Sequence, residues 1–149
     1  MNELAPSTST ATRVLLIDDE PGLIAALTDA LQMVSGYEVI VARDGAQGVE
    51  RFLEVRPDCV VVDIRMPRVN GYQFVRALRA DVETANVPII ILSALVQESQ
   101  QLAGLLTGAD AYLEKPVSLT DLLDAIDTAV QLTPEDRCAN LSLLSAHEE

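Results

Sequence analysis

The chain has 149 residues, 49% of them apolar, and a formal net charge of −13. This length suits one domain with a short surplus at both ends. The excess of acid disfavours direct binding to nucleic acid, because that binding depends on Lys and Arg at the phosphates, and it disfavours an anionic membrane surface for the same reason. No apolar run reaches the roughly 18 residues of a membrane helix. Residues 1–13 are polar and rich in Ser and Thr, unlike a secretory signal.

The two cysteines, Cys59 and Cys138, have neither the spacing of metal ligands nor the pattern of a disulfide framework. We therefore expect a cytoplasmic protein. Residues 1–12 are interpreted as a flexible N-terminal tail, residues 13–132 as one domain, and residues 133–149 as a C-terminal tail or a short extra helix.

Five apolar segments are predicted to form β-strands: residues 13–17, 37–42, 59–62, 87–93 and 109–113. The third is the most informative, because Cys59 and three valines run straight into Asp63, and Met66-Pro67 then ends the strand. A short continuous apolar run of this kind indicates a strand that is covered on both faces of a parallel sheet.

Helical spacing of apolar residues follows each strand. The first helix begins at Pro21, where proline is favoured, and ends at Ser35-Gly36. The second is capped by Asp44 and is predicted to turn three residues towards the core, namely Ala46, Val49 and Leu53.

A third helix is predicted to follow Asn70 and to reach Ala80, with Phe74, Ala77 and Leu78 facing inwards. The fourth, at about residues 97–107, is the weakest because it opens with polar residues and contains a glycine. The fifth begins at the cap Ser118 and carries the clearest apolar stripe, formed by Leu119, Leu122, Leu123, Ile126 and Val130.

Five strand–helix repeats predict an α/β fold, with a parallel sheet covered by helices on both faces. Right-handed crossovers leave few arrangements of such a chain. A reversal between the first and third strands gives the flavodoxin-like (βα)5 fold, a doubly wound sheet with strand order 2-1-3-4-5.

Polar residues follow the carboxyl ends of these strands: Asp18, Asp19 and Glu20, then Asp63, Ser93 and Lys115, which is the only lysine. A parallel sheet brings these ends to one edge. Neighbouring carboxylates repel each other unless their pKa values rise or a cation binds, and Mg²⁺ suits carboxylate and phosphate oxygens. A carboxylate can also act as the nucleophile that forms an aspartyl phosphate, with a lysine and a hydroxyl beside it.

Taken singly, each residue has a simpler interpretation. Asp18-Asp19 could support a helix N-terminus, Ser93 could be a loop serine, and Lys115 could be a solvated charge. Their joint position at the strand ends makes a phosphoryl-transfer site the better interpretation.

The chain resembles the receiver domain of two-component response regulators, the CheY-like receivers, over about residues 13–132. Five separated motifs carry the resemblance in order: Asp18-Asp19, Asp63, Met66-Pro67 with Gly71, Ser93-Ala94 and Lys115-Pro116. The resemblance implies phosphorelay signal transduction, in which the protein is phosphorylated by a sensor histidine kinase or a histidine phosphotransfer protein.

The resemblance also implies roles for individual residues. Asp63 would be the phosphoacceptor, and Lys115 would contact the phosphoryl group. Magnesium would be bound by Asp19, Asp63 and the backbone carbonyl of Arg65, with Asp18 contributing through water.

Two further residues would form the switch that responds to phosphorylation. Ser93 would turn towards the phosphoryl group and Tyr112 would change rotamer, which would alter a face for partner binding. The Lys115–Pro116 peptide bond would be cis.

The output is left open by the sequence. The chain could be a single-domain regulator that acts on a downstream protein, or a receiver module fused to an output domain. Many DNA-binding members dimerise through charged pairs on the fourth helix, fifth strand and fifth helix. Here the fourth helix has no Lys or Arg, and the fifth carries Asp121, Asp124 and Asp127 without a base, which disfavours that mode. A phosphorylation-dependent dimer of another kind stays open.

Three alternative functions agree less well with the sequence. A magnesium-dependent phosphatase with an aspartate nucleophile would carry D-x-D after the first strand, where this chain has adjacent Asp18-Asp19. A flavin site would need a phosphate-binding loop after the first strand, but the acids at that position would repel the flavin's phosphate group. A receiver-like binding module without phosphorylation is disfavoured because all of the site residues are present. We therefore expect no enzymatic activity beyond the domain's own phosphotransfer and dephosphorylation.

Overall fold

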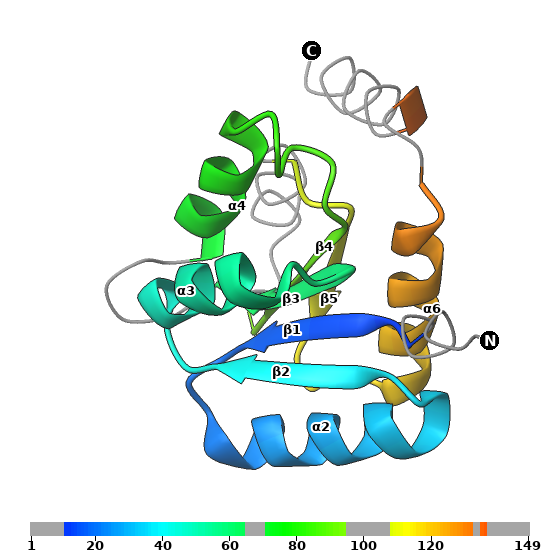
Figure 1. Cartoon of the computed structure of the whole chain (residues 1–149). Coiled ribbons are helices and arrows are strands. Elements are labelled where there is room, and N and C mark those ends of the chain that lie inside the picture. Colours follow the sequence, from blue (N-terminus) through cyan, green and yellow to red (C-terminus); the bar gives the residue numbers. More distant parts are fainter. Residues whose placement is uncertain (1–10, 65–70, 95–107, 133–134, 137–149) are drawn as a thin grey trace, which may run out of the picture.

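The computed structural model describes residues 11–64, 71–94, 108–132 and 135–136. Its centre is a parallel five-stranded sheet in the order β2-β1-β3-β4-β5 (Figure 1). The strands are β1 (Arg13–Ile17), β2 (Glu38–Ala42), β3 (Cys59–Asp63), β4 (Ile89–Ser93) and β5 (Ala111–Glu114). The described helices are α2 (Pro21–Ser35), α3 (Gly45–Val55), α4 (Gly71–Ala80) and α6 (Leu119–Val130). The predicted fold class and strand order are confirmed.

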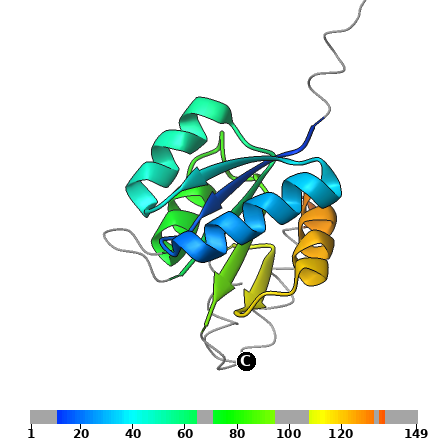
Figure 2. The same cartoon turned by 90° about the horizontal axis from the view of Figure 1, so that it is seen from below.

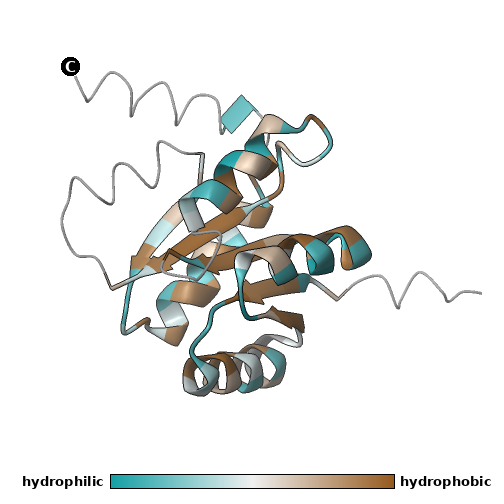
Figure 3. Ribbon diagram, turned by 90° about the vertical axis from the view of Figure 1, so that its left-hand side faces the viewer, coloured by the Kyte–Doolittle hydropathy of each residue, from teal (hydrophilic) through white to brown (hydrophobic). Residues whose placement is uncertain are grey.

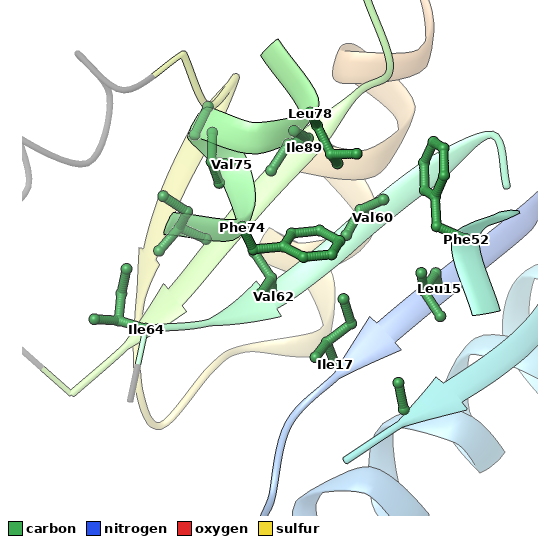
Figure 4. Close-up of a cluster of buried hydrophobic side chains, with 13 residues drawn as sticks. Leu15, Ile17, Phe52, Val60, Val62, Ile64, Phe74, Val75, Leu78 and Ile89 are labelled. Carbon is green, nitrogen blue, oxygen red and sulfur yellow. The ribbon is translucent and has the colours of Figure 1, made fainter. Parts of the chain in front are cut away.

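Alternate residues of each strand pack on opposite faces of the sheet, as the period of a strand requires. On one face, Phe52 of α3 and Phe74 of α4 lie against Ile17, Val60 and Val62 (Figure 4). On the other face, α2 and α6 pack over the intervening strand residues, and Figure 2 views this side with α2 in front of the strands. The two central strands β3 and β4 are buried throughout, and Figure 3 shows the apolar residues concentrated in the sheet.

The predicted inner face of α3 is wrong. Ala46 is exposed, and the residues Val49 and Leu53 are 42% and 57% exposed. The buried face instead consists of Gly45, Gly48 and Phe52. A Cβ atom on Gly48 would lie 2.7 Å from Cδ1 of Ile17, so α3 approaches β1 closely only because this residue has no side chain.

Two other helices differ in detail from the prediction. In α4, Ala77 is exposed and Val75 takes its place in the core beside Phe74 and Leu78. In α6, the fully buried positions are Leu122 and Ile126 together with Ala129, and Val130 at the end of the stripe is 36% exposed.

Helix termini follow the predicted signals where the structure describes them. Asp44 accepts a hydrogen bond from the backbone N–H of Gln47, and Ser118 accepts one from that of Asp121. Gly36 ends α2 in the left-handed conformation, with φ of 68°. The predicted cap Asn70 and the predicted helix at residues 97–107 lie outside the described residues, as does the C-terminal segment apart from residues 135–136.

A buried ion pair fixes the start of β5, and sequence patterns did not indicate it. Arg79 at the end of α4 lies 3.2 Å from Asp110, and it also donates hydrogen bonds to the carbonyl oxygens of Ala85, Val87 and Gly108. The Asp110 carboxylate additionally accepts the backbone N–H of Ile89 at 2.8 Å. This network holds the amino ends of β4 and β5 against α4.

None of the described helices has the length and apolar character needed to span a membrane.

Candidate functional site

The predicted site residues lie at the carboxyl ends of the strands. Asp18 follows β1 directly, Asp63 ends β3, Ser93 ends β4 and Lys115 follows β5. The register pairs Asp63 with Leu92 and Ser93 with Glu114, so the ends of three neighbouring strands are level. The parallel sheet thus brings together residues that are up to 97 positions apart in the sequence.

Asp18 is held rigidly at the bottom of this edge. Asp18 is fully buried, and both of its carboxylate oxygens accept hydrogen bonds. Oδ1 accepts the backbone N–H of Glu20 at 3.0 Å, and Oδ2 accepts Nζ of Lys115 at 2.9 Å. Its neighbour Asp19 is exposed. The first strand therefore supplies one acid fixed in the protein and one that is open to solvent.

Lys115 bridges the acids of two strands. Its Nζ atom lies 2.9 Å from Asp18, 3.3 Å from Oδ1 of Asp63 and 3.8 Å from Oε1 of Glu20. Burial by itself lowers the pKa of this ammonium group, but the hydrogen bond to Asp18 and the charge of Asp63 outweigh it, so the pKa is raised. Lys115 is therefore a fixed positive charge beside the candidate phosphoacceptor.

Asp63 is nearly buried, with a residue exposure of 5%. Burial raises the pKa of its carboxyl above the ordinary value, the charge of Asp18 raises it further, and Lys115 offsets part of the rise. The carboxylate thus lies in a site with an excess of negative charge that a single lysine does not balance.

Three carboxylates of this site can approach one ion together. Asp18, Asp19 and Asp63 each offer an oxygen, and these atoms lie within 4.8 Å of one another. Hard cations such as Mg²⁺ prefer oxygen ligands and bind through one or two carboxylates and several waters. The donor set therefore fits magnesium. The carbonyl of Arg65, predicted as a further ligand, lies outside the described residues.

Ser93 lies on the β4 side of Asp63 and is 1% exposed. Its carbonyl oxygen accepts the backbone N–H of Lys115 at 2.7 Å, which ties the ends of β4 and β5 together. The peptide bond between Lys115 and Pro116 is cis, as predicted from the resemblance.

Tyr112 on β5 packs against the α3–α4 side of the sheet. Its hydroxyl oxygen is buried. Tyr72 of α4 lies nearby, and its pKa is raised by burial and by Tyr112. Sequence patterns did not indicate this pair of tyrosines, because a helix and a strand far apart in the chain contribute one ring each.

Gly71 lies directly against the strand that carries Asp63. A Cβ atom at Gly71 would be 2.6 Å from the carbonyl oxygen of Asp63 and 2.9 Å from Cα of Ile64. The Gly71 N–H also donates to the carbonyl of Ile64 at 3.0 Å. The glycine that follows Asn70 is therefore required by close backbone packing beneath the site.

Comparison with known proteins agrees with this fold. Residues 14–127 match the family model of the response regulator receiver domain. The transcriptional regulatory protein PrrA of Mycobacterium tuberculosis is 43% identical over 114 residues, which are 76% of this chain and 48% of that protein. The DNA-binding dual master transcriptional regulator RpaA of Synechocystis is 34% identical over 121 residues, 81% of this chain and 50% of that protein.

Solved structures give the same result. The chemotaxis response regulator CheY4 of Vibrio cholerae superimposes with a TM-score of 0.75 at 29% identity, covering 80% of this chain and 99% of CheY4. The receiver domain of Francisella response regulator 1452 also gives a TM-score of 0.75 at 29% identity, covering 80% and 97%. The chain belongs to the response regulator receiver family of two-component signalling. It spans about half the length of the curated relatives that it matches.

Proposed function

We propose that the protein accepts a phosphoryl group on Asp63 from a phosphohistidine of a sensor histidine kinase or a histidine phosphotransfer protein. In this step a carboxylate oxygen of Asp63 forms a bond to phosphorus while the bond between phosphorus and the donor's imidazole nitrogen breaks. The single observation that supports it most strongly is Lys115, whose ammonium lies between Asp18 and Asp63 at 2.9 and 3.3 Å.

Lys115 has two tasks in this proposal. Before transfer, its charge favours the ionised form of Asp63, which is the nucleophilic form, against the burial that raises the carboxyl pKa. During transfer, the same ammonium stabilises negative charge on the phosphoryl oxygens. Because Asp18 holds Lys115 from the other side, the lysine needs little reorganisation as charge develops.

Asp18, Asp19 and Asp63 would hold Mg²⁺, together with the backbone carbonyl of Arg65. The bound ion supplies positive charge that lets acidic side chains and phosphoryl oxygens share one site. Asp18 is fixed by Glu20 and Lys115, whereas Asp19 is exposed, so we assign the direct contact to Asp19 and a water-mediated contact to Asp18.

The response to phosphorylation is assigned to Ser93 and Tyr112. A phosphoryl group adds acceptor oxygens and negative charge beside Ser93, which lies at the end of the neighbouring strand. Tyr112 lies beside Tyr72 of α4 on one face of the sheet, so a change of its rotamer would alter the contact between β5 and α4. Movement of these two side chains would alter the surface that a partner recognises.

The output is a protein partner or a fused output domain. The matched relatives PrrA and RpaA are named as transcriptional regulators, and this chain matches only about half of each. We also place the receiver in the cytoplasm. Its net charge of −13 disfavours direct contact with DNA or with an anionic membrane surface. It would catalyse only its own phosphotransfer and dephosphorylation.

The test is incubation with acetyl phosphate in Mg²⁺ or in chelator, followed by intact-protein mass spectrometry. Wild type should gain one phosphoryl group only with Mg²⁺, and Asp63→Asn should gain none. Asp29→Asn, which alters an exposed acid of α2, is the matched control and should behave as wild type. Equal incorporation into Asp63→Asn would contradict the proposal.

A further inference from the structure

A second tyrosine lies beside the proposed switch residue Tyr112, and phosphotransfer by itself gives it no role. Tyr112 of β5 and Tyr72 of α4 both pack against the hydrophobic cluster of Figure 4. The strand register pairs Val62 with Ile91 and Ile91 with Tyr112, so Tyr112 continues a row of side chains that begins on the strand of Asp63. The two tyrosine rings therefore lie together on the side of the sheet that α4 covers.

The Tyr112 hydroxyl needs a polar partner at this place. Its oxygen is buried, and a buried hydroxyl that makes no hydrogen bond costs free energy. Apart from the two tyrosines, the described members of the cluster have apolar side chains, which offer no hydrogen bond. Tyr72 does offer one. Burial raises the pKa of Tyr72 most, and the charge of Tyr112 and a hydrogen bond to Tyr112 raise it further.

Tyr72 is also fixed to the backbone that carries the candidate phosphoacceptor. It directly follows Gly71, whose N–H donates to the carbonyl of Ile64 at 3.0 Å. A Cβ atom on Gly71 would lie 2.6 Å from the carbonyl oxygen of Asp63, so the start of α4 is packed tightly on the end of β3. Tyr72 is therefore held in place while the neighbouring ring of Tyr112 changes rotamer.

We propose that Tyr72 is the positioning residue of the switch: its hydroxyl holds Tyr112 in the buried rotamer and so sets the population of that rotamer before phosphorylation. This inference rests on the proposed function, in which Tyr112 changes rotamer when Asp63 is phosphorylated. Loss of the Tyr72 hydroxyl removes one hydrogen bond from the buried rotamer and none from an exposed one. The population of the exposed rotamer should then rise about two- to tenfold, which is the effect of one ordinary hydrogen bond.

Tyr72→Phe tests this proposal, because the substitution removes the hydroxyl and keeps the ring that packs against the cluster. The chain has three tyrosines, so tyrosine labelled with ¹³C at the ring positions next to the hydroxyl gives few NMR signals, and single substitutions assign them. A soluble paramagnetic reagent broadens the signals of exposed rings. Tyr37→Phe is the matched control, because Tyr37 packs on the opposite face of the sheet.

The spectra are recorded in chelator without a phosphate donor, and circular dichroism checks that each variant is folded. In Tyr72→Phe, broadening of the Tyr112 signal should report an exposed population about two- to tenfold higher than in wild type. Tyr37→Phe should match wild type. Unchanged broadening in Tyr72→Phe, or an equal increase in Tyr37→Phe, would overturn the proposal.

This measurement is separate from phosphotransfer, which is followed in the same proteins by uptake of a phosphoryl group from acetyl phosphate and Mg²⁺. Unchanged broadening in Tyr72→Phe together with normal uptake by wild type would contradict only the role of Tyr72. Wild type that takes up no phosphoryl group would contradict the proposed function, and the tyrosine pair would then be no part of a phosphorylation switch.

Discussion

Replacing Gly71 by alanine should displace the strand that carries Asp63. The added Cβ atom would lie 2.6 Å from the carbonyl oxygen of Asp63, whereas ordinary contacts begin at 3.4 Å, so α4 and β3 must separate by about 0.8 Å. The neighbouring atoms are backbone, which cannot turn aside as a flexible side chain would. The perturbation therefore reaches the candidate phosphoacceptor itself.

Two magnitudes follow from this displacement. Forcing an extra carbon into a packed interior costs about 1–3 kcal/mol of unfolding free energy. Alanine is intrinsically favoured over glycine in a helix by about 1 kcal/mol, so a net loss of stability can only come from the contact with β3. A catalytic group misplaced by about 1 Å can lose roughly 100-fold in rate, so we expect phosphorylation by acetyl phosphate to slow by at least about tenfold.

The assay combines urea unfolding with the rate of phosphoryl incorporation. Gly22→Ala in α2 is the control, because a Cβ atom at Gly22 meets nothing within 4 Å. The control should keep wild-type stability or gain slightly, and it should keep the wild-type rate. If Gly71→Ala also keeps both, the close packing of α4 beneath Asp63 is not required for the site.

Three further predictions concern the site and the core. Lys115→Met leaves the buried carboxylates of Asp18 and Asp63 without their ammonium partner and should lower the unfolding free energy in chelator by about 3–5 kcal/mol. Mg²⁺ should raise the melting temperature of this variant more than that of wild type, and equal increases in the two proteins would contradict this prediction. Burial raises the pKa of the Asp63 carboxyl, so the folded state binds the carboxyl proton more tightly than the unfolded chain does. The Asp63 carboxyl therefore lowers the free energy of unfolding as the pH rises from the unfolded pKa of about 3.9 through the raised pKa of the folded state. In chelator, Asp63→Asn should therefore be more stable than wild type at neutral pH and lose that advantage at acidic pH. The check is urea unfolding of both proteins at several pH values, and a difference in unfolding free energy that does not change with pH would contradict this reasoning. Phe52→Ala should lower the unfolding free energy by about 3–5 kcal/mol, whereas Leu53→Ala should change it by no more than about 0.5 kcal/mol, as measured by chemical unfolding. The reverse order would mean that the buried face of α3 is misassigned.

The strands were predictable because their signal is strong and continuous. The runs that end in Asp63 and Ser93 are buried at every position, which is the pattern of central strands in a parallel sheet. Once the strand order followed from the repeated strand–helix units, the meeting of the acids with Lys115 at one edge also followed. Topology rather than local sequence placed these residues together.

The helix faces were less predictable where glycine is the packing residue. In α3, the apolar residues Val49 and Leu53 suggest an inner face, but the close approach to β1 is made by Gly48, which carries no hydrophobic signal. The bridge between Arg79 and Asp110 was equally hidden, because it pairs a helix end with a strand start 31 residues later. Periodicity describes one helix at a time and does not include such contacts.

The most direct test of the central claim is to locate the phosphoryl group. Borohydride reduces an aspartyl phosphate to homoserine, and peptide mass spectrometry identifies the residue that has changed. After treatment with acetyl phosphate and Mg²⁺, we expect homoserine at position 63 alone. Homoserine at position 18 or 19, or at no position while wild type still takes up phosphate, would contradict the assignment of Asp63 as the phosphoacceptor.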